Sequence, residues 1–217
     1  MATPYFQLRL DRVPSTQDVA RSEIDDLPVL VLAGGQSRGR GRSGAEWLNA
    51  DRALAASLAL RLGDREARPL SLMAGVAAVR ATQGTTLKWP NDVMYDKLKV
   101  GGILVERSGD KAVIGLGLNL WWPEPPGGAG SLFERDPGEK AHVEIGALWA
   151  AELMEVIDGE RWPIIAYREA CDTIGREITW EPAGSGLAVD VDEQGGLIVE
   201  TPEGTKTVHS GAVSHIR

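Results

Sequence analysis

The stretch Gly34–Trp47 reads Gly-Gly-Gln-Ser-Arg-Gly-Arg-Gly-Arg-Ser-Gly-Ala-Glu-Trp and directly follows the short apolar run Val29–Ala33. That run is rich in β-branched and aliphatic residues, which predicts a buried strand. Alternating glycine and arginine gives a backbone that a ligand can approach closely, with guanidinium groups that pair well with carboxylates and phosphates. The alternative is a solvated surface loop. The stretch is not a P-loop, because the Gly-Lys-Ser/Thr ending is missing.

A second stretch, Lys88-Trp89-Pro90-Asn91-Asp92, is followed by Lys97, Lys99 and the pair Gly101-Gly102. Pro-Asn-Asp predicts a turn, and the Lys-Val-Gly-Gly segment opens a strand. A lysine beside two glycines can reach a ligand that lies against bare backbone. A surface hairpin with its lysines in water is the alternative.

Two further stretches carry polar groups next to predicted strands and helices. In Gly115–Leu120, glycines inside a strand indicate close approach by a ligand or another backbone, and Asn119 offers an amide for a ribose or phosphate. Tight packing of that strand on a helix is the alternative. In Pro14–Gln17, Ser15 or Thr16 is predicted to cap a helix, and a capping hydroxyl can still face a pocket.

The chain as a whole predicts an α+β domain over residues 1–174 and a small all-β domain over residues 175–217. Strands are expected at Phe6–Leu10, Val29–Ala33, Val100–Glu106 and Ala112–Leu120, and helices at Ser15–Glu23, Leu70–Thr82, Ala141–Asp158 and Trp162–Cys171. The stretch Leu54–Leu62 is ambiguous, although its composition favours a helix. After Gly175, five short strand-like runs alternate with Gly-containing turns: Ile178–Trp180, Leu187–Val191, Leu197–Glu200, Thr205–Val208 and Val213–Ile216.

Composition and charge argue against a nucleic-acid-binding, membrane-spanning or secreted protein. The 217 residues carry a formal charge of −8, and the basic residues Arg38, Arg40 and Arg42 are too few for a surface that tracks nucleic acid. No apolar run is long enough to span a membrane, and the N-terminus lacks the layout of a signal peptide. A single cysteine, Cys171, fits a reducing compartment, so a cytoplasmic protein is expected.

In their order along the chain, the four stretches resemble the biotin protein ligase family. The most specific parts are Gly39-Arg40-Gly41-Arg42 with Gly44 and Trp47, and Lys88-Trp89-Pro90-Asn91-Asp92 with Lys99 and Gly102. The resemblance implies a catalytic domain with a class II synthetase-like mixed sheet, followed by a small SH3-like β-barrel. It also implies the family's reaction, in which ATP activates biotin to biotinyl-5′-AMP and biotin passes to a lysine of a biotin carboxyl carrier domain.

The resemblance also assigns roles to individual residues. It places Ser15, Thr16, Gln17, Gln36, Arg40, Gly41, Arg42, Lys99 and Gly102 around biotin. It places Arg40, Arg42, Trp47, Lys88, Asn91, Lys99 and Asn119 around ATP and the adenylate. Lys99, Arg42 and Asp92 are the residues expected to take part in catalysis. Mg²⁺ is expected to bind mainly through the phosphates of ATP, with no dedicated protein ligands.

The sequence departs from the family pattern at a few positions. Gln17 stands where the family commonly has Asn, and Ala45 and Glu46 replace residues that are often basic. No winged helix precedes the first catalytic strand, so neither a repressor role nor a nucleic-acid partner is expected. A homodimer is compatible with the sequence. The C-terminal strands carry none of the four stretches, so they are expected to order loops and help dock the acceptor rather than to build the phosphate site.

Two other functions are compatible with the same residues. A lipoate or octanoate ligase of the same fold needs an apolar tunnel and lacks the Gly-Arg-Gly-Arg arrangement. A non-catalytic binding module would not need Lys99 and Arg42.

Overall fold

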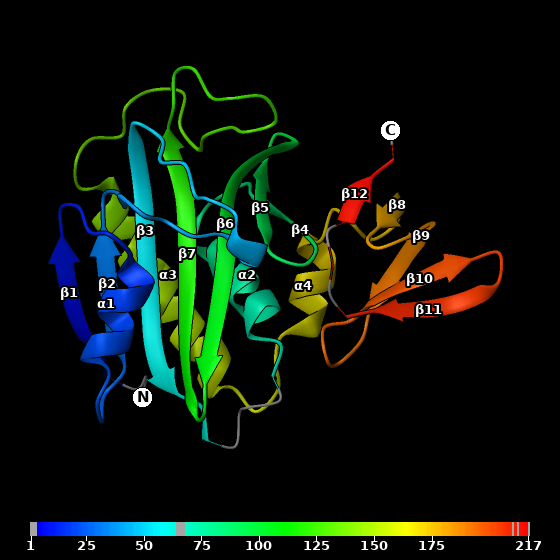
Figure 1. Ribbon diagram of the computed structural model, residues 1–217, viewed down its shortest axis with the longest axis horizontal. Coiled ribbons are helices and arrows are strands. Elements are labelled where there is room, and N and C mark those ends of the chain that lie inside the picture. The colour runs from blue at the N-terminus through cyan, green and yellow to red at the C-terminus, as the bar shows by residue number, and fades with distance from the viewer. Residues whose placement is uncertain (1–3, 64–67, 210, 212, 217) are drawn as a thin grey trace.

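The computed structural model describes residues 4–63, 68–209, 211 and 213–216, and it arranges them around two β-sheets (Figure 1). The larger sheet has the order β1-β2-β3-β7-β6-β5-β4. Only β1 and β2 run parallel; the other neighbours are antiparallel. Its strands are β1 (Phe6–Leu10), β2 (Val29–Ala33), β3 (Arg52–Arg61), β4 (Thr86–Lys88), β5 (Asp92–Tyr95), β6 (Leu98–Ser108) and β7 (Lys111–Trp121).

Helices cover both faces of this sheet. The helix α1 (Thr16–Glu23) packs on one face, against β2, β3 and β7. On the other face α2 (Leu70–Ala81) contacts β6 and β7, and α3 (Ala141–Asp158) contacts β2 and β3 (Figure 1). The predicted helices at these three positions are confirmed. Ser15 is the N-cap of α1, because its side chain accepts a hydrogen bond from the Asp18 amide at 3.4 Å.

The helix that the composition of Leu54–Leu62 favours is wrong, because residues 54–61 lie in the ten-residue strand β3. Alanine and leucine favour helices by only a few tenths of a kcal/mol per residue. In the folded chain β3 pairs with β2 on one side and β7 on the other, and eight consecutive residues, 53–60, are buried. Small alanine side chains let α1 and α3 approach the two faces of this strand. Tertiary pairing therefore overrides local propensity.

Two local predictions are refined. The turn predicted at Pro90–Asp92 is confirmed, but it joins two strands, β4 and β5, which are too short to show a clear period in the sequence. The helix predicted at Trp162–Cys171 is shorter, and α4 comprises Ile164–Ala170. Pro163 is its N-cap, since proline has no amide hydrogen and suits only the start of a helix.

The C-terminal strands form a second, antiparallel sheet in the order β11-β10-β9-β8-β12. Its strands are β8 (Glu177–Trp180), β9 (Gly184–Val191), β10 (Leu197–Thr201), β11 (Gly204–Val208) and β12 (Val213–His215). All five predicted strands are confirmed, and the arrangement agrees with the SH3-like unit that the resemblance implies. None of the described helices is long and apolar enough to cross a membrane.

The two sheets share one hydrophobic core and are joined by specific polar contacts. Buried residues of both parts, such as Tyr167 and Val191, belong to the same cluster. The indole of Trp89, only 2% exposed, donates to the Gly195 carbonyl at 3.0 Å, and that of Trp162 donates to the Glu193 carbonyl at 3.0 Å. The first contact fixes the smaller sheet against the turn between β4 and β5, and the second fixes it against the segment that precedes α4.

Trp89→Phe tests how strongly this junction contributes to stability. The substitution keeps an aromatic ring but leaves the buried Gly195 carbonyl without its donor, so the free energy of unfolding should fall by about 1–3 kcal/mol. Urea denaturation followed by far-UV circular dichroism measures the change. Trp122→Phe is the control, because Trp122 is only half-buried and lies in the loop after β7. Equal stability of both variants would show that the Trp89 bond contributes nothing.

Candidate active site

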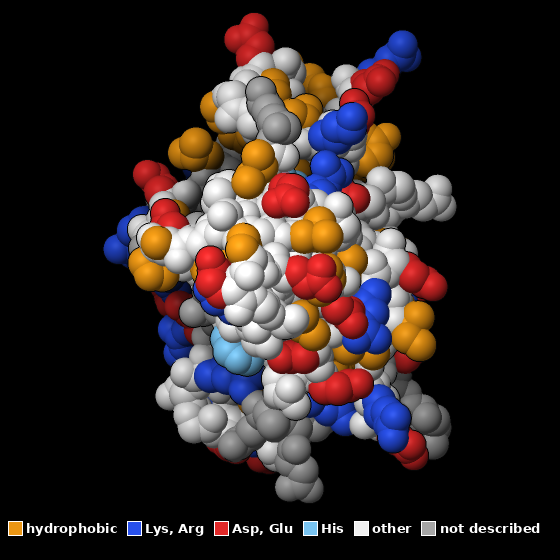
Figure 2. All heavy atoms as spheres, turned by 90° about the vertical axis from the view of Figure 1, so that its right-hand side faces the viewer, with side chains coloured by type: hydrophobic (Ala, Val, Ile, Leu, Met, Phe, Trp, Pro, Cys, Tyr) orange, Lys and Arg blue, Asp and Glu red, His pale blue; other side chains and the backbone are white. Residues whose placement is uncertain are grey.

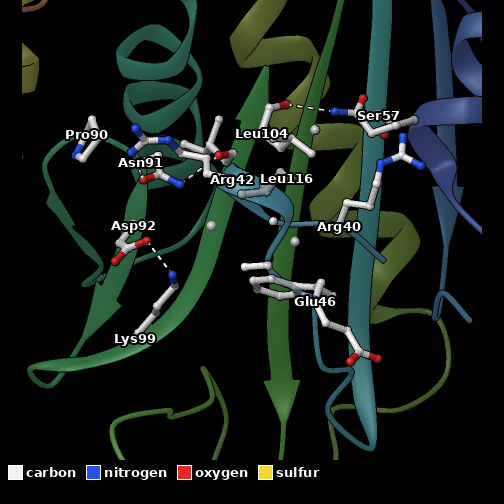
Figure 3. A pocket seen from close by; sticks show the side chains of 18 of the residues that line it. Arg40, Arg42, Glu46, Ser57, Pro90, Asn91, Asp92, Lys99, Leu104 and Leu116 are labelled. Carbon is white, nitrogen blue, oxygen red and sulfur yellow. Dashed lines mark hydrogen bonds and ion pairs between the residues drawn. The ribbon is translucent and has the colours of Figure 1, made fainter. Parts of the chain in front are cut away.

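A cavity of about 630 Å³ lies on the α1 side of the larger sheet (Figure 3). The segment that links β2 to β3 crosses this face of the sheet (Figure 1) and contributes to the lining. The polar residues singled out in the sequence converge on it from α1, the Gly-Arg segment and the strands β5 and β6. Those that line it are Ser15, Thr16, Gln17, Gln36, Arg40, Gly41, Arg42, Trp47, Asn91, Asp92, Lys99 and Gly102. The stretches Pro14–Gln17, Gly34–Trp47 and Lys88–Gly102 thus contribute side chains to one cavity. The stretch Gly115–Leu120 contributes Gly115, Leu116 and Gly117 to the lining.

Glycines in β6 and β7 form a floor on which bulky side chains rest. A Cβ atom on Gly117 would lie 2.8 Å from Cε2 and Cζ2 of the Trp47 indole, and one on Gly102 would lie 3.4 Å from its Cζ3. A Cβ on Gly115 would lie 3.2 Å from the amide nitrogen of Gln17. The sequence predicted close approach at these glycines. The structure shows that the approaching groups include side chains of the chain itself.

The Gly-Arg segment is a short, internally bonded loop. The Gly41 amide donates to the Ala45 carbonyl at 2.7 Å, and the Trp47 amide donates to the Gly39 carbonyl at 3.0 Å. Between them lies a single 3₁₀ turn, Arg42–Gly44. The indole of Trp47 therefore anchors this loop to strands β6 and β7.

One end of the cavity is a buried network of hydroxyl and amide groups. Thr16 donates to Gln36 Oε1 from its amide at 2.8 Å and from its hydroxyl at 3.1 Å, and the Ser57 hydroxyl donates to Thr16 Oγ1 at 2.8 Å. Asn49 Oδ1 accepts the Gln36 amide at 3.0 Å. Sequence reasoning missed Ser57 and Asn49. The signal for Ser57 was a lone hydroxyl in an otherwise apolar run.

Two buried polar atoms of lining residues have no partner within the described chain: Gln17 Oε1 and Trp47 Nε1. The Gln17 amide nitrogen is used, since it donates to the Leu104 carbonyl at 3.0 Å. A buried polar group without a hydrogen bond costs about 1–3 kcal/mol, so these two atoms are an energetic cost of the present arrangement. Both atoms are buried, so neither faces the open cavity in this arrangement.

Arg40 lines the cavity, but its guanidinium is held by carboxylates at the rim. It pairs with both oxygens of Asp18, at 2.7 and 2.8 Å, and with Glu106 at 3.4 Å. The Arg40 guanidinium lowers the pKa of Asp18 from its ordinary value, chiefly through their hydrogen bond. In this arrangement Arg40 ties the Gly-Arg loop to α1 and β6.

The other cations meet at the opposite side of the cavity (Figure 3). Arg42 donates to Asn91 Oδ1 at 3.0 Å, and Lys99 Nζ lies 2.6 Å from Asp92 Oδ1. Asn91 in turn donates to the Ile103 carbonyl at 3.0 Å, which fixes its amide. The arrangement presents two positive groups beside a half-buried carboxylate, with fixed neighbours.

Two predicted site residues lie elsewhere. Lys88, in β4, is not among the residues that line the cavity. Asn119 is also absent from the lining; its amide donates to the Gly130 carbonyl at 3.0 Å, while its Oδ1 is buried without a partner. The Gly130 amide donates to the Lys99 carbonyl at 2.9 Å. Asn119 therefore orders the loop that holds the backbone of Lys99.

The smaller sheet also reaches the cavity, although it was expected only to order loops and help dock the acceptor and not to build the phosphate site. Glu181, Gly211 and Val213 belong to the lining, next to Pro90 and Asn91. Gly211 permits this approach, because a Cβ there would lie 3.0 Å from the Glu181 carbonyl oxygen, and its φ of 125° suits glycine alone. No local motif in the sequence marked these residues.

Comparison with known proteins agrees with this geometry. Residues 10–119 match the model of the biotin/lipoate A/B protein ligase family, and residues 173–216 match the biotin protein ligase C-terminal domain. The chain is 32% identical to the biotin–[acetyl-CoA-carboxylase] ligase of Mycobacterium tuberculosis, over 91% of this chain and 83% of that protein.

The chain belongs to the biotin protein ligase family. A ligase of the same name from Paracoccus denitrificans is 31% identical over 84% of this chain and 88% of that protein. The biotin protein ligase of Aquifex aeolicus in complex with biotin and ATP superposes with a TM-score of 0.83 and 28% identity, covering 98% of this chain and 99% of that one. The family resemblance seen in the sequence is confirmed.

Gly117→Ala is expected to release the family's Gly-Arg loop from the sheet. The added methyl group would overlap the Trp47 ring, so the indole must leave its floor. Limited trypsin digestion measures this, because Arg38, Arg40 and Arg42 lie in the segment that would be freed. Cleavage after these arginines should become at least several-fold faster.

Gly127→Ala is the matched control, since nothing lies within 4 Å of a Cβ at that position. Unchanged loop cleavage in a folded Gly117→Ala variant would contradict the anchoring role of Trp47.

Proposed function

We propose that this chain activates biotin with ATP, releasing pyrophosphate, and transfers biotin from biotinyl-5′-AMP to a lysine of a biotin carboxyl carrier domain. The observation that carries the proposal is the polarity of the cavity. A buried hydroxyl and amide network occupies one end, and Arg42 and Lys99 stand at the other. The first end suits a small polar ring, and the second suits a carboxylate that meets a phosphate.

The chemistry of the first step explains the cations. A biotin carboxylate oxygen attacks the α-phosphorus of ATP, a P–O bond forms, and the bond to the leaving pyrophosphate breaks. The two reactants are both anions, and charge accumulates on the phosphoryl oxygens in the transition state. Lys99 and Arg42 offset this charge, and Asp92 and Asn91 hold them in place. Fixed charges stabilise a transition state much more strongly in a site that excludes water than they do in water.

Mg²⁺ fits this site as an ion held by the substrate. No group of three or more His, Cys, Asp or Glu among the described residues could hold a metal by itself, and Asp92 already pairs with Lys99. When bound with ATP, Mg²⁺ neutralises the leaving pyrophosphate.

The product of the first step is a mixed anhydride, which water would hydrolyse. The loop anchored by Trp47 stands over the cavity and is the element best placed to exclude water from it.

The acceptor in the second step is proposed to be a carboxyl carrier domain, because the relatives at 31–32% identity are ligases of acetyl-CoA carboxylase. A lipoate or octanoate substrate is the competing proposal, since the matched family model includes lipoate ligases. The polar network of Thr16, Gln36 and Ser57 favours biotin, because a polar ring can form further hydrogen bonds with these groups and an alkyl chain cannot.

Biotin-dependent exchange of radioactive pyrophosphate into ATP tests the proposal. The protein should catalyse exchange with biotin but not with lipoate or octanoate, and it should then label a purified carrier domain. Exchange with lipoate instead would favour the competing substrate, and no exchange with any acid would indicate a non-catalytic binding module.

Lys99→Gln should lower the exchange rate at least about 100-fold, the loss typical of removing one fixed charge from a transition state. Lys97→Gln is the matched control. It lies two residues away at the β5–β6 turn and does not line the cavity, so its exchange rate should equal that of the unmodified protein. Equal rates for the two variants would remove Lys99 from the mechanism.

A further inference from the structure

A second, open hollow of about 440 Å³ lies on the smaller sheet and meets the catalytic cavity at one residue. Its lining comprises Trp180, Glu181, Pro182, Lys206, Thr207, Val208 and His209. Glu181 also lines the catalytic cavity, beside Gly211 and Val213. A group that follows the hollow toward the reacting atoms must therefore pass Glu181.

The second hollow combines apolar and charged side chains, a lining that can bind a segment of polypeptide. Trp180 and Pro182 give it apolar surface on one side, and Val208 does so from β11. Lys206, its cation, is engaged by Glu203 at 3.6 Å. Figure 2 looks onto this side of the molecule, where acidic side chains lie among hydrophobic ones. Residues 175–217 contain seven Asp or Glu against three Lys or Arg, so this part attracts positive charge.

Among the carboxylates of the catalytic cavity, Glu181 is the one that also lines the second hollow. The acidic residues in the lining are Glu46, Asp92 and Glu181. Asp92 is paired with Lys99 at 2.6 Å, and Glu46 points away from that pair in Figure 3. Glu181 is exposed and makes no ion pair with any residue that the structure describes.

We propose that Glu181 binds the ammonium group of the acceptor lysine at the mouth of the catalytic cavity, and that the hollow beside it receives the polypeptide segment carrying that lysine. This inference rests on the proposed function. At neutral pH a lysine amine is mostly protonated, so it arrives as a cation and is drawn by an unpaired carboxylate. Glu181 acts as a positioning and specificity residue, selecting lysine side chains before they reach the anhydride.

Glu181 takes up no proton in the transfer step, because both protons that the lysine loses pass to solvent. The ammonium loses one proton to solvent as it moves from Glu181 into the cavity. The neutral amine attacks the acyl carbon, the amide C–N bond forms, and the C–O bond to phosphate breaks. AMP leaves with the electron pair of that bond, and the second amine proton passes to solvent.

Glu181→Gln tests the proposal, with Glu200→Gln as the matched control. Glu200 is an exposed glutamate of the same sheet that lines neither hollow. Pyrophosphate exchange is measured first, because its loss in the unmodified protein would reject the proposed function rather than the role of Glu181. Single-turnover transfer from preformed adenylate to a purified carrier domain follows, over a range of carrier concentrations.

Glu181→Gln should keep the exchange rate of the unmodified protein and lose about tenfold in kcat/KM for the carrier domain, mainly through a higher KM. The loss should shrink at high salt, which screens the attraction. Hydroxylamine, a nucleophile that is uncharged at neutral pH, should discharge the adenylate at the same rate in both proteins.

Three results would overturn the proposal. The first is transfer to the carrier domain equal to that of Glu200→Gln. The second is an equal loss with hydroxylamine, because Glu181 would then act on the chemistry rather than on the ammonium. The third is an equal loss of pyrophosphate exchange, because Glu181 would then serve the activation step.

Discussion

The contact of the Trp47 indole with the glycines of β6 and β7 is the constraint on which the site depends. At Gly117 a single Cβ atom would come within 2.8 Å of the ring, so no other residue fits beneath it. The indole fixes one end of the Gly-Arg loop, and the bonds within that loop fix Gly39, Gly41 and Ala45. A cavity roof that carries Arg40 and Arg42 exists because the strands below it lack side chains at these points.

The smaller sheet supplies part of the wall of the cavity that the larger sheet forms. Trp89 lies in the turn that also presents Asn91, and its bond to Gly195 holds this turn against the C-terminal strands. Glu181, Gly211 and Val213 thereby reach the cavity wall. The two parts share a continuous hydrophobic core, so the site belongs to both of them. This arrangement suits an enzyme with two half-reactions, because the part built on the larger sheet can hold the adenylate while the smaller sheet contacts the acceptor.

Much of this was predictable from the sequence, and the failures have physical causes. The strands with β-branched or alternating residues and the amphipathic helices were predicted well, because their local preference agrees with their final packing. The strand β3 was missed because its alanines and leucines favour a helix, and only pairing with β2 and β7 makes it a strand. Twelve of the fourteen predicted site residues line the cavity. Ser57 and Glu181 were missed because they reach the cavity through long-range topology and belong to no motif, and the lone hydroxyl of Ser57 in an apolar run was its one local signal.

In the proposed reaction, the loop that rests on the glycines of β6 and β7 covers the reactive anhydride. Hydrogen–deuterium exchange of the amides of Gly41 and Trp47, with and without biotin and ATP, tests it most directly. Both amides are hydrogen-bonded within the loop and report its opening. Their exchange should slow markedly once biotin and ATP are present and turnover to the adenylate has occurred. Exchange that stays unchanged while adenylate accumulates on the protein would contradict the account.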